Sequence, residues 1–374
     1  MKRFLRRLVE ADTTAGKGEL AAAEIISAEL SQSGIDSTID SWDSNRANLI
    51  ARIKSAGHRR PLLFACHLDV VEPGHEGWES PPFEAVEREG RIYGRGSADM
   101  KGGIAAIVTA VRQLVDSGVK LAGDIILVAA AGEETDSCGA KRFIRDFGGK
   151  LPKLAGVILP EPTEFEVVTA HRGMLWLRVT TKGKAAHGST PQLGINAIGS
   201  MKTVLAELEN YKIDVEPHKL LGGCSMSINT ISGGREINVV PDECSIGIDI
   251  RTLPGQNHQD IIDDFEKIFA RLKGERQEFK AAVSVVREVA ALQTDNNCDF
   301  VRDFCSVVGA GGTRAVGFTT DGPHFAPLGA PVVIFGPGES DVCHKPNEYI
   351  VFADVEKAVE YYKKYHFKIL DLSS

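Results

Sequence analysis

The sequence lacks long apolar runs, and it lacks an excess of basic charge. No apolar stretch approaches the roughly 20 residues that a membrane-spanning helix requires, so we expect no membrane partner. The formal net charge of the 374 residues is −8 at pH 7, whereas a general nucleic-acid-binding protein would carry a basic surface. We therefore expect no nucleic-acid partner. Segment 1–10 is basic but has no continuous apolar core, so we interpret it as an amphipathic helix rather than as a signal peptide.

The seven cysteines are scattered along the chain, and no Cys-x-x-Cys pair occurs. Scattered thiols in odd number favour a reduced, cytoplasmic protein over a disulfide-framed domain or a structural zinc knuckle. Cys66 and Cys343 each directly precede a histidine that is a candidate metal ligand. If those segments are extended, neighbouring side chains point to opposite sides, so both thiols are expected to point away from the metal and to fill core space. A role as ligand is the alternative.

The chain is longer than a single hydrophobic core usually serves, so two domains are expected. Residues 1–173 and 291–374 show an alternation of helices and strands that predicts an α/β domain. The expected helices cover 18–33, 104–114, 138–147, 295–308 and 353–369, and the expected strands cover 35–40, 48–53, 62–66, 124–131, 154–159 and 331–335. Residues 174–290 read instead as strand, helix, two strands, helix and strand, which is the α+β ferredoxin-like unit. This second domain is therefore inserted into the first.

The stretch 61–110 holds the first two candidate metal ligands. His67 and Asp69 stand two residues apart at the end of an apolar strand, so they face the same side while the backbone stays extended. A metal histidine needs such a carboxylate to orient its ring through the second nitrogen. A long loop then leads to Asp99 in a glycine-rich turn, directly before an apolar helix. His-x-Asp alone is more often a packing pair at a strand end, but ordered loops of this length are usually functional.

Acidic residues also follow the next two apolar strands. Glu133 and Glu134 come after strand 124–131, and Glu161 comes after strand 154–159. Because ligands of an open α/β sheet bind beyond the carboxyl ends of its strands, we expect these side chains to converge with His67 and Asp99. His344, in a loop after the strand 331–335, supplies a second imidazole. Taken singly, a Gly-Glu-Glu turn or a loop histidine is usually a surface feature; the joint order of all six residues is the stronger signal.

Two imidazoles and four carboxylates suit a pair of zinc ions, although manganese or cobalt could substitute. One carboxylate must then bridge the two metals, and Asp99 is best placed to do so. Glu133 and Glu134 are adjacent and cannot share one direction. One of them would bind metal, and the other would be free to take the proton of the attacking water. A nucleotide site is disfavoured, because Gly94-x-Gly96 lacks both the Gly-x-Gly-x-x-Gly pattern and the Gly-Lys-Ser/Thr ending.

These motifs resemble one known family over nearly the whole chain. The matching segments are His67-Leu68-Asp69, the Gly94–Gly102 turn with Asp99, Glu133-Glu134, Glu161-Pro162-Thr163, and Gly336-Pro337-Gly338 through His344. The chain looks like a member of the co-catalytic zinc peptidase and deacylase family of acetylornithine deacetylase, succinyl-diaminopimelate desuccinylase, aminoacylase and glutamate carboxypeptidase. The cysteine before each histidine ligand departs from the family, whose residues there are usually small or aliphatic.

The resemblance implies a mixed-sheet catalytic domain with an inserted lid and dimerisation domain, and two Zn²⁺ per subunit. It places His67 and Glu161 on one zinc ion, Glu134 and His344 on the other, and Asp99 between them. Glu133 is then the general base and Asp69 orients His67. His187 would stabilise the tetrahedral oxyanion from the other subunit of a homodimer, while Asn238 and Arg251 would hold a substrate carboxylate. The resemblance also implies a cis Asp99–Met100 peptide.

The expected function is that of a cytoplasmic dizinc amidohydrolase that removes the N-acyl group from an N-acyl amino acid. Gly-Pro-Gly followed by His344-x-Pro-Asn-Glu-Tyr looks most like acetylornithine deacetylase. The alternatives are a desuccinylase, or a dipeptidase or carboxypeptidase of the same family. A catalytically silent metal-binding protein is a more distant alternative, and the presence of Glu133 argues against it.

Overall fold

The structure is a computed structural model that describes residues 1–43 and 45–371, with side chains described through residue 365. The chain forms two compact units. The first unit contains Met1–Thr169, Gln293–Ala315 and Thr320–Ser374, and the second contains Ala170–Leu292 and Val316–Thr319. No sequence pattern signals that the short segment Val316–Thr319 belongs to the second unit.

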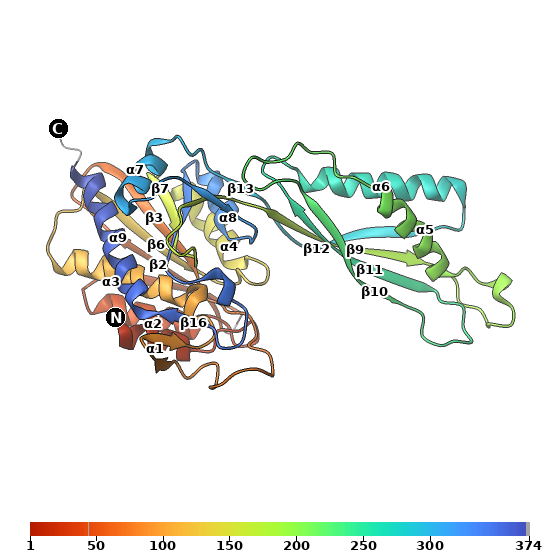
Figure 1. Cartoon of the computed structure of the whole chain (residues 1–374), viewed down its shortest axis with the longest axis horizontal. Coiled ribbons are helices and arrows are strands. Elements are labelled where there is room, and N and C mark those ends of the chain that lie inside the picture. Colours follow the sequence, from red (N-terminus) through yellow and green to blue (C-terminus); the bar gives the residue numbers. More distant parts are fainter. Residues whose placement is uncertain (44, 372–374) are drawn as a thin grey trace. The chain divides into compact units, whose positions relative to one another are not determined.

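The first unit follows the expected alternation of helices and strands (Figure 1). Before the insertion its elements are α1 (Lys2–Glu10), α2 (Leu20–Ser31), β1 (Ser37–Trp42), β2 (Arg46–Ile53), β3 (Arg59–His67), β4 (Val86–Arg88), β5 (Arg91–Tyr93), α3 (Gly102–Asp116), β6 (Gly123–Ala130), α4 (Cys138–Phe147), β7 (Gly156–Leu159) and β8 (Val168–His171). After it come β13 (Leu292–Gln293), α7 (Asp299–Val308), β14 (Arg314–Val316), α8 (Gly322–Phe325), β15 (Val332–Ile334), β16 (Tyr349–Val351) and α9 (Phe352–Asp371).

The large sheet of the first unit is mixed, as expected. Its strand order is β1-β2-β6-β3-β7-β15-β8-β13, and β14 pairs with β8. The neighbours β6, β3, β7 and β15 run parallel, while β1 pairs antiparallel with β2, β2 with β6, and β8 with β15. Four adjacent parallel strands therefore bring their carboxyl ends to one edge, where the chain continues into the predicted site.

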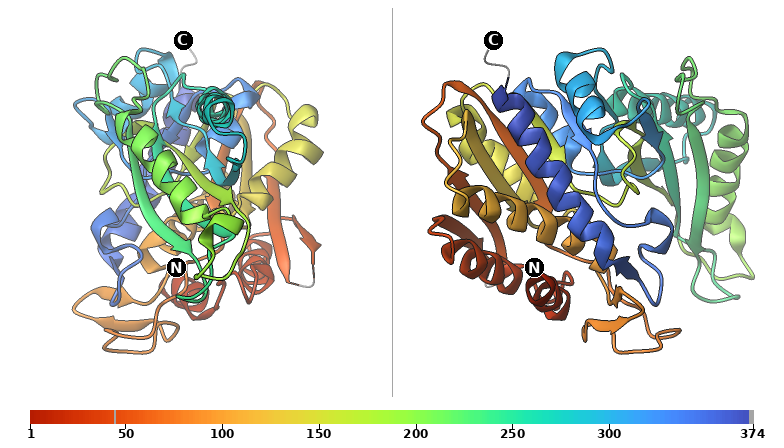
Figure 2. Two further views of the ribbon diagram at one scale, coloured as in Figure 1. Left: turned by 90° about the vertical axis from the view of Figure 1, so that its right-hand side faces the viewer. Right: turned by 60° about the vertical axis from the view of Figure 1, so that its left-hand side comes forward.

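Helices cover both faces of this sheet (Figure 2). On one face α3 packs against α9, and α9 packs against α7. On the other face α4 packs against β2, β6 and α8. The strands of the parallel part are buried along nearly their whole length, which explains their continuous apolar sequences. Cys66 lies in the core that also contains residues of α3 and α9, as expected for a thiol that fills space.

A separate small sheet of strand order β16-β5-β4 lies beside the site. β5 leads through Gly94 into the turn that carries Asp99, and β16 follows directly after the loop that carries His344. The two strands pair antiparallel, with Tyr349 opposite Tyr93. The pairing thus joins two ligand-bearing segments that are about 250 residues apart in sequence.

The second unit has the expected element order, with β9 (Gly173–Lys182), α5 (Ala197–Asn210), β10 (Ser225–Gly233), β11 (Glu243–Thr252), α6 (His258–Glu275) and β12 (Ala281–Val289). Its sheet has the antiparallel strand order β10-β11-β9-β12. Both helices cover one face of this sheet, and their apolar side chains share a core with Leu177, Ile248 and their neighbours on the strands. A role of this unit as lid or dimerisation domain stays a prediction.

Candidate metal centre

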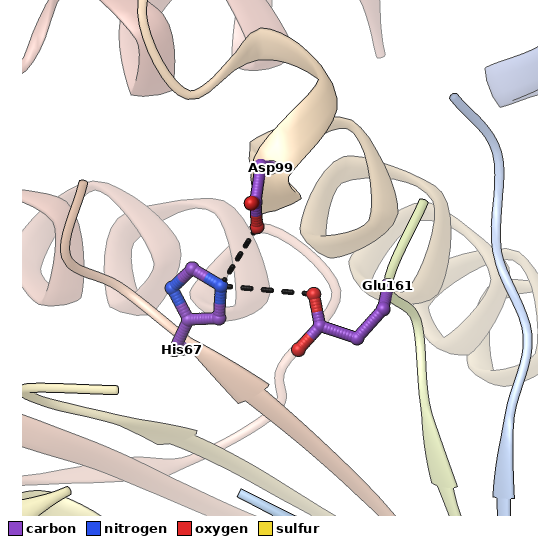
Figure 3. A group of neighbouring side chains, drawn as sticks. All are labelled: His67, Asp99 and Glu161. Carbon is purple, nitrogen blue, oxygen red and sulfur yellow. Dashed lines mark hydrogen bonds and ion pairs between the residues drawn. The ribbon is translucent and has the colours of Figure 1, made fainter. Parts of the chain in front are cut away.

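His67 lies at the buried end of β3, between two carboxylates. Its Nε2 is 3.0 Å from Oδ1 of Asp99 and 3.7 Å from Oε2 of Glu161 (Figure 3). Ligand atoms of these three side chains all lie within 4.8 Å of one another, so they could hold one metal ion. Glu161 reaches this position because it follows β7, the strand beside β3.

A second group shares Asp99 with the first. Nε2 of His344 is 3.3 Å from Oδ2 of Asp99 and 3.0 Å from Oε1 of Glu134. Asp99 thus presents one carboxylate oxygen to each histidine, which is the arrangement expected of a bridging carboxylate. The His344 side chain is 52% exposed, whereas that of His67 is 2% exposed. The centre is therefore closed on the His67 side and open to solvent on the His344 side.

Asp69 makes more contacts than the sequence predicts. Nδ1 of His67 is 3.0 Å from the backbone oxygen of Asp69 and 3.6 Å from its Oδ1. The ring is therefore oriented mainly by the carbonyl, with the carboxylate nearby. The two carboxylate oxygens accept the backbone N–H groups of Glu133 and Glu134, at 3.0 and 2.9 Å. Asp69 consequently fixes the turn that carries both glutamates.

Glu133 is buried close to the first group. Its carboxylate also lies within 4.8 Å of ligand atoms of His67 and Glu134, so proximity alone does not separate the roles of the two glutamates. Glu134 is the one that contacts His344, which favours it as the ligand. Burial raises the pKa of Glu133 well above its usual value, and the nearby charge of Glu134 adds to this effect.

The charge balance of the cluster fits a divalent cation. Hydrogen bonds to Asp99 and Glu134 raise the pKa of His344 to about 10. Burial acts to lower the pKa of His67, but Glu161, Asp69 and Asp99 outweigh it and raise that pKa. Both shifts report an excess of negative charge around the imidazoles. Carboxylate oxygens and imidazole nitrogens are ligands that zinc, manganese and cobalt accept, so these residues fit the expected pair of metals.

The backbone around the ligands is specialised. The Asp99–Met100 peptide is cis, as the resemblance implied. His344 has a φ of 63°, in the left-handed region, so the argument from an extended segment does not apply to Cys343. That thiol donates a hydrogen bond to the Glu339 carbonyl at 3.4 Å.

A Cβ at Gly336 would lie 2.6 Å from the carbonyl oxygens of Pro160 and Glu161, which explains why this loop position is glycine.

Two further residues near the centre were not found from the sequence. Asp321 is 5% exposed and lies beside Cys66, His67, Glu133 and Glu161. Its charge is one of the causes that raise the pKa of Glu133, after burial and Glu134. An acidic residue directly before the Gly322-Pro323 start of a short helix was the only local signal.

The second is Glu348, a buried acidic residue that follows His344 by four positions in the Pro-Asn-Glu-Tyr segment. Its carboxylate accepts the backbone N–H groups of Ala98 and Asp99. An acidic residue next to an expected ligand loop was a weak signal, because its partners are set by the pairing of β5 with β16.

The three remaining predicted residues lie in the second unit. His187 and Asn238 are neighbours there: Gly188 donates its N–H to the Asn238 carbonyl at 2.6 Å, and both side chains are exposed. Nδ1 of His187 is 2.7 Å from Oγ of Ser189. Arg251 lies near the end of β11 and pairs with Asp249, with its Nε 2.9 Å from Oδ1. Their predicted roles toward substrate stay predictions.

Comparison with known proteins identifies the family. The sequence profile of Peptidase family M20/M25/M40 matches residues 63–368, which is most of the chain. The chain belongs to this family. It is accordingly a metal-dependent hydrolase that acts on amide bonds, and the family resemblance drawn from the motifs is confirmed.

Curated relatives of this M20 protein carry two different names. A probable succinyl-diaminopimelate desuccinylase of Staphylococcus epidermidis is 31% identical over 386 aligned positions, covering 91% of this chain and 93% of the relative. An acetylornithine deacetylase of Myxococcus xanthus is 28% identical, covering 95% of this chain and 93% of the relative. Both activities remove an acyl group from an amino acid, so the relatives agree on the reaction type and differ in the acyl group.

Solved structures support the fold. An M20 family metallo-carboxypeptidase of Sulfolobus solfataricus has a TM-score of 0.81 and 18% identity, covering 97% of this chain and 98% of that one. A dinuclear metal-binding peptidase of family M20 from Bacillus subtilis has a TM-score of 0.72 and 16% identity, covering 99% and 97%. The α/β fold class is therefore confirmed. Within residues 1–43 and 45–371, none of the helices is long and apolar enough to cross a membrane.

Proposed function

We propose that this M20 protein is a dizinc hydrolase that removes the N-acyl group from an N-acyl amino acid. The observation that carries the proposal is the shared position of Asp99, whose two carboxylate oxygens face His67 and His344 on opposite sides. Asp99 with His67 and Glu161 would hold one zinc ion, and Asp99 with Glu134 and His344 would hold the other. Bound at such a centre, zinc polarises an amide carbonyl and makes an attacking water more acidic.

Glu133 is the proposed general base. Its carboxylate is buried beside the two ligand groups, and burial raises its pKa. In the proposed reaction, a carboxylate oxygen of Glu133 takes the proton of the attacking water and delivers it to the departing amine nitrogen. Asp69 supports this role, because it holds the Glu133 N–H at 3.0 Å.

The acyl group is proposed from weaker signals. The Gly-Pro-Gly and His344-x-Pro-Asn-Glu-Tyr segments favour an acetyl group, as in acetylornithine deacetylase. A desuccinylase is the second candidate, because a curated relative at 31% identity carries that name. A dipeptidase or carboxypeptidase is the third, since structural neighbours include such enzymes. The proposed partner in each case is a small molecule with a free carboxylate, which Arg251 and Asn238 would hold.

A homodimer is proposed from distances within the second unit. In the β9–β11 pairing, Arg251 lies opposite Met174 and Glu243 lies opposite Lys182. These two pairs are eight residues apart along β9, or about 26 Å at 3.3 Å per residue. His187 lies beyond Lys182, so it is farther still from Arg251. A small substrate cannot span that distance, so if both residues act on it, they come from two copies of the chain. Asn238 neighbours His187, so it would come from the same copy as His187 and not from the copy that supplies Arg251.

The edge strand β10 is the proposed contact between the copies. It is the outer strand of its sheet and is exposed along nearly its whole length. Ile231 is 62% exposed there, and Ile198 of α5 is 44% exposed; a Cβ at Gly234, the residue after β10, would lie 3.7 Å from Cδ1 of Ile198. An exposed edge strand with apolar side chains is a surface that a second copy can pair with.

The cytoplasm is the proposed compartment, because all seven cysteines are free thiols.

A substrate screen tests the proposed reaction. The metal-loaded protein is assayed with N-acetyl amino acids, N-succinyl amino acids and dipeptides, with zinc or cobalt added. The proposal expects at least one N-acyl amino acid to be cleaved with a higher kcat/KM than any dipeptide. Cleavage of dipeptides alone would replace the deacylase by the peptidase, and absence of cleavage across all three classes would contradict the proposal.

A further inference from the structure

Glu348 is a buried carboxylate in contact with the backbone of the shared residue Asp99. Its side chain is 0% exposed, and the residue immediately precedes β16. One oxygen, Oε1, accepts the N–H of Ala98 at 2.9 Å and the N–H of Asp99 at 3.1 Å. The other oxygen, Oε2, accepts a hydrogen bond from Nη1 of Arg95 at 2.5 Å. These donors all belong to the Gly94–Gly102 turn that carries Asp99.

Arg95 extends this contact to the loop that carries His344. Its side chain is 2% exposed, and its Nη1 also donates to the carbonyl of Lys345, the residue after His344, at 3.4 Å. The guanidinium lies 5.3 Å from the ring centre of Trp78, which packs on it from the loop before β4. The backbone of Glu348 itself accepts the N–H of Gly94 at 2.9 Å. Arg95, which belongs to the Asp99 turn, therefore contacts the His344 loop, and Glu348, which follows that loop, contacts the Asp99 turn.

A buried ion pair is seldom retained for stability alone, because removing two charges from water costs about as much as their attraction returns. The partners of Glu348 suggest a different purpose. Glu348 holds the backbone of Asp99, the proposed ligand that faces both histidines. Oδ2 of Asp99 is 3.3 Å from Nε2 of His344. Residues that orient ligands in this way tune metal affinity, and their loss typically weakens it by about 10–100-fold.

We infer that Glu348, paired with Arg95, is a positioning residue that fixes the bridging carboxylate of Asp99 relative to His344 and so sets the metal affinity of the centre. The inference rests on the proposed function, since it assumes that these residues bind metal. Glu348 itself touches neither substrate nor metal in this account. It acts through the backbone of Asp99.

The test is a metal titration of three variants. In Glu348→Gln the side chain keeps its shape but offers one oxygen to three donors, so an amide nitrogen must face an N–H. Glu348→Asp keeps the charge and withdraws the oxygens from the Asp99 turn, and it serves as a second variant if the first does not fold. Glu29→Gln is the matched control, because Glu29 is a buried carboxylate paired with Arg112 away from the ligands. Each metal-depleted protein is titrated with buffered Zn²⁺ at a temperature where circular dichroism shows it folded.

We expect Glu348→Gln and Glu348→Asp to bind at least one zinc equivalent about tenfold or more weakly than the natural chain, and Glu29→Gln to bind both equivalents unchanged. Equal affinity in all four proteins, or an equal loss in the Glu29 control, would overturn the inference while the proposed function stands. If the natural chain itself takes up no zinc, the proposed function fails, and this inference falls with it.

Discussion

The carboxylate of Asp69 holds the backbone of Glu133. Its Oδ1 accepts the Glu133 N–H at 3.0 Å, and its Oδ2 accepts the N–H of the next residue at 2.9 Å. The residue predicted to orient a histidine therefore also fixes the turn on which the proposed base and a proposed ligand stand. Because Asp69 is buried, neither bond can be replaced by bulk water.

The double contact gives a prediction for Asp69→Asn. An asparagine has one oxygen for two N–H groups, so a buried donor is left without an acceptor, at a cost of about 1–3 kcal/mol in the free energy of unfolding. The shifted turn should also lower kcat by about 10–100-fold. Asp124→Asn is the control, since Asp124 accepts the Ser55 N–H at 2.8 Å away from the centre. A variant at Asp69 with unchanged kcat would show that the turn needs no such support.

The site could be predicted from the sequence where each ligand stands at the end of a strongly apolar strand. His67 is the last residue of β3, and Glu134 and Glu161 follow β6 and β7. The continuous burial of these strands is visible as apolar sequence, and parallel strands place their carboxyl ends together. Glu348 could not be predicted in this way. Its partners depend on the register of β5 with β16, two three-residue strands too short to leave a pattern. Asp321 likewise follows no long strand.

The second prediction concerns recognition of the substrate carboxylate. Arg251 is already held by Asp249, with Nη2 donating to Oδ2 at 3.1 Å, so its guanidinium is oriented before substrate arrives. If it forms a forked pair with a carboxylate, Arg251→Lys should lower kcat/KM for an acyl amino acid by about 10–100-fold. The same variant should have little effect on the corresponding amide, which the natural chain should cleave poorly. Equal kcat/KM of the natural chain on acid and amide would remove Arg251 from this role.

The third prediction is a pH effect on stability from His171. Burial lowers the pKa of this fully buried imidazole from 6.5 to about 4. Between pH 4 and pH 6.5 the imidazole is therefore protonated in the unfolded chain and neutral in the folded chain. The contribution of His171 to stability is thus complete above pH 6.5 and is lost as the pH falls toward 4. His171→Gln should abolish this share, about 2–3 kcal/mol between pH 7.5 and 4.5. Urea unfolding of the metal-free proteins measures it, and parallel pH dependences for the two would contradict the assignment.

The fourth prediction is that His187 acts across a dimer. Two inactive variants, His187→Ala and Glu133→Gln, are mixed and their subunits are allowed to exchange. If His187 serves the partner's centre, each mixed dimer contains one site with both residues intact, and activity should return to up to about a quarter of that of the natural chain. If it serves its own subunit, every site lacks one residue and the mixture stays inactive. A monomer in solution with full activity would also refute the proposal.

The most direct test of the account is metal binding measured together with turnover in the natural chain, Glu133→Gln and Glu134→Gln. Each protein is stripped with a chelator and titrated with zinc, while bound metal and hydrolysis of an N-acyl amino acid are followed. We predict two zinc equivalents in the natural chain and in Glu133→Gln, with turnover lower by about 10²–10⁴-fold in the latter, and weaker zinc binding in Glu134→Gln. Zinc binding lost in Glu133→Gln but retained in Glu134→Gln, or full hydrolysis by the metal-free natural chain, would contradict it.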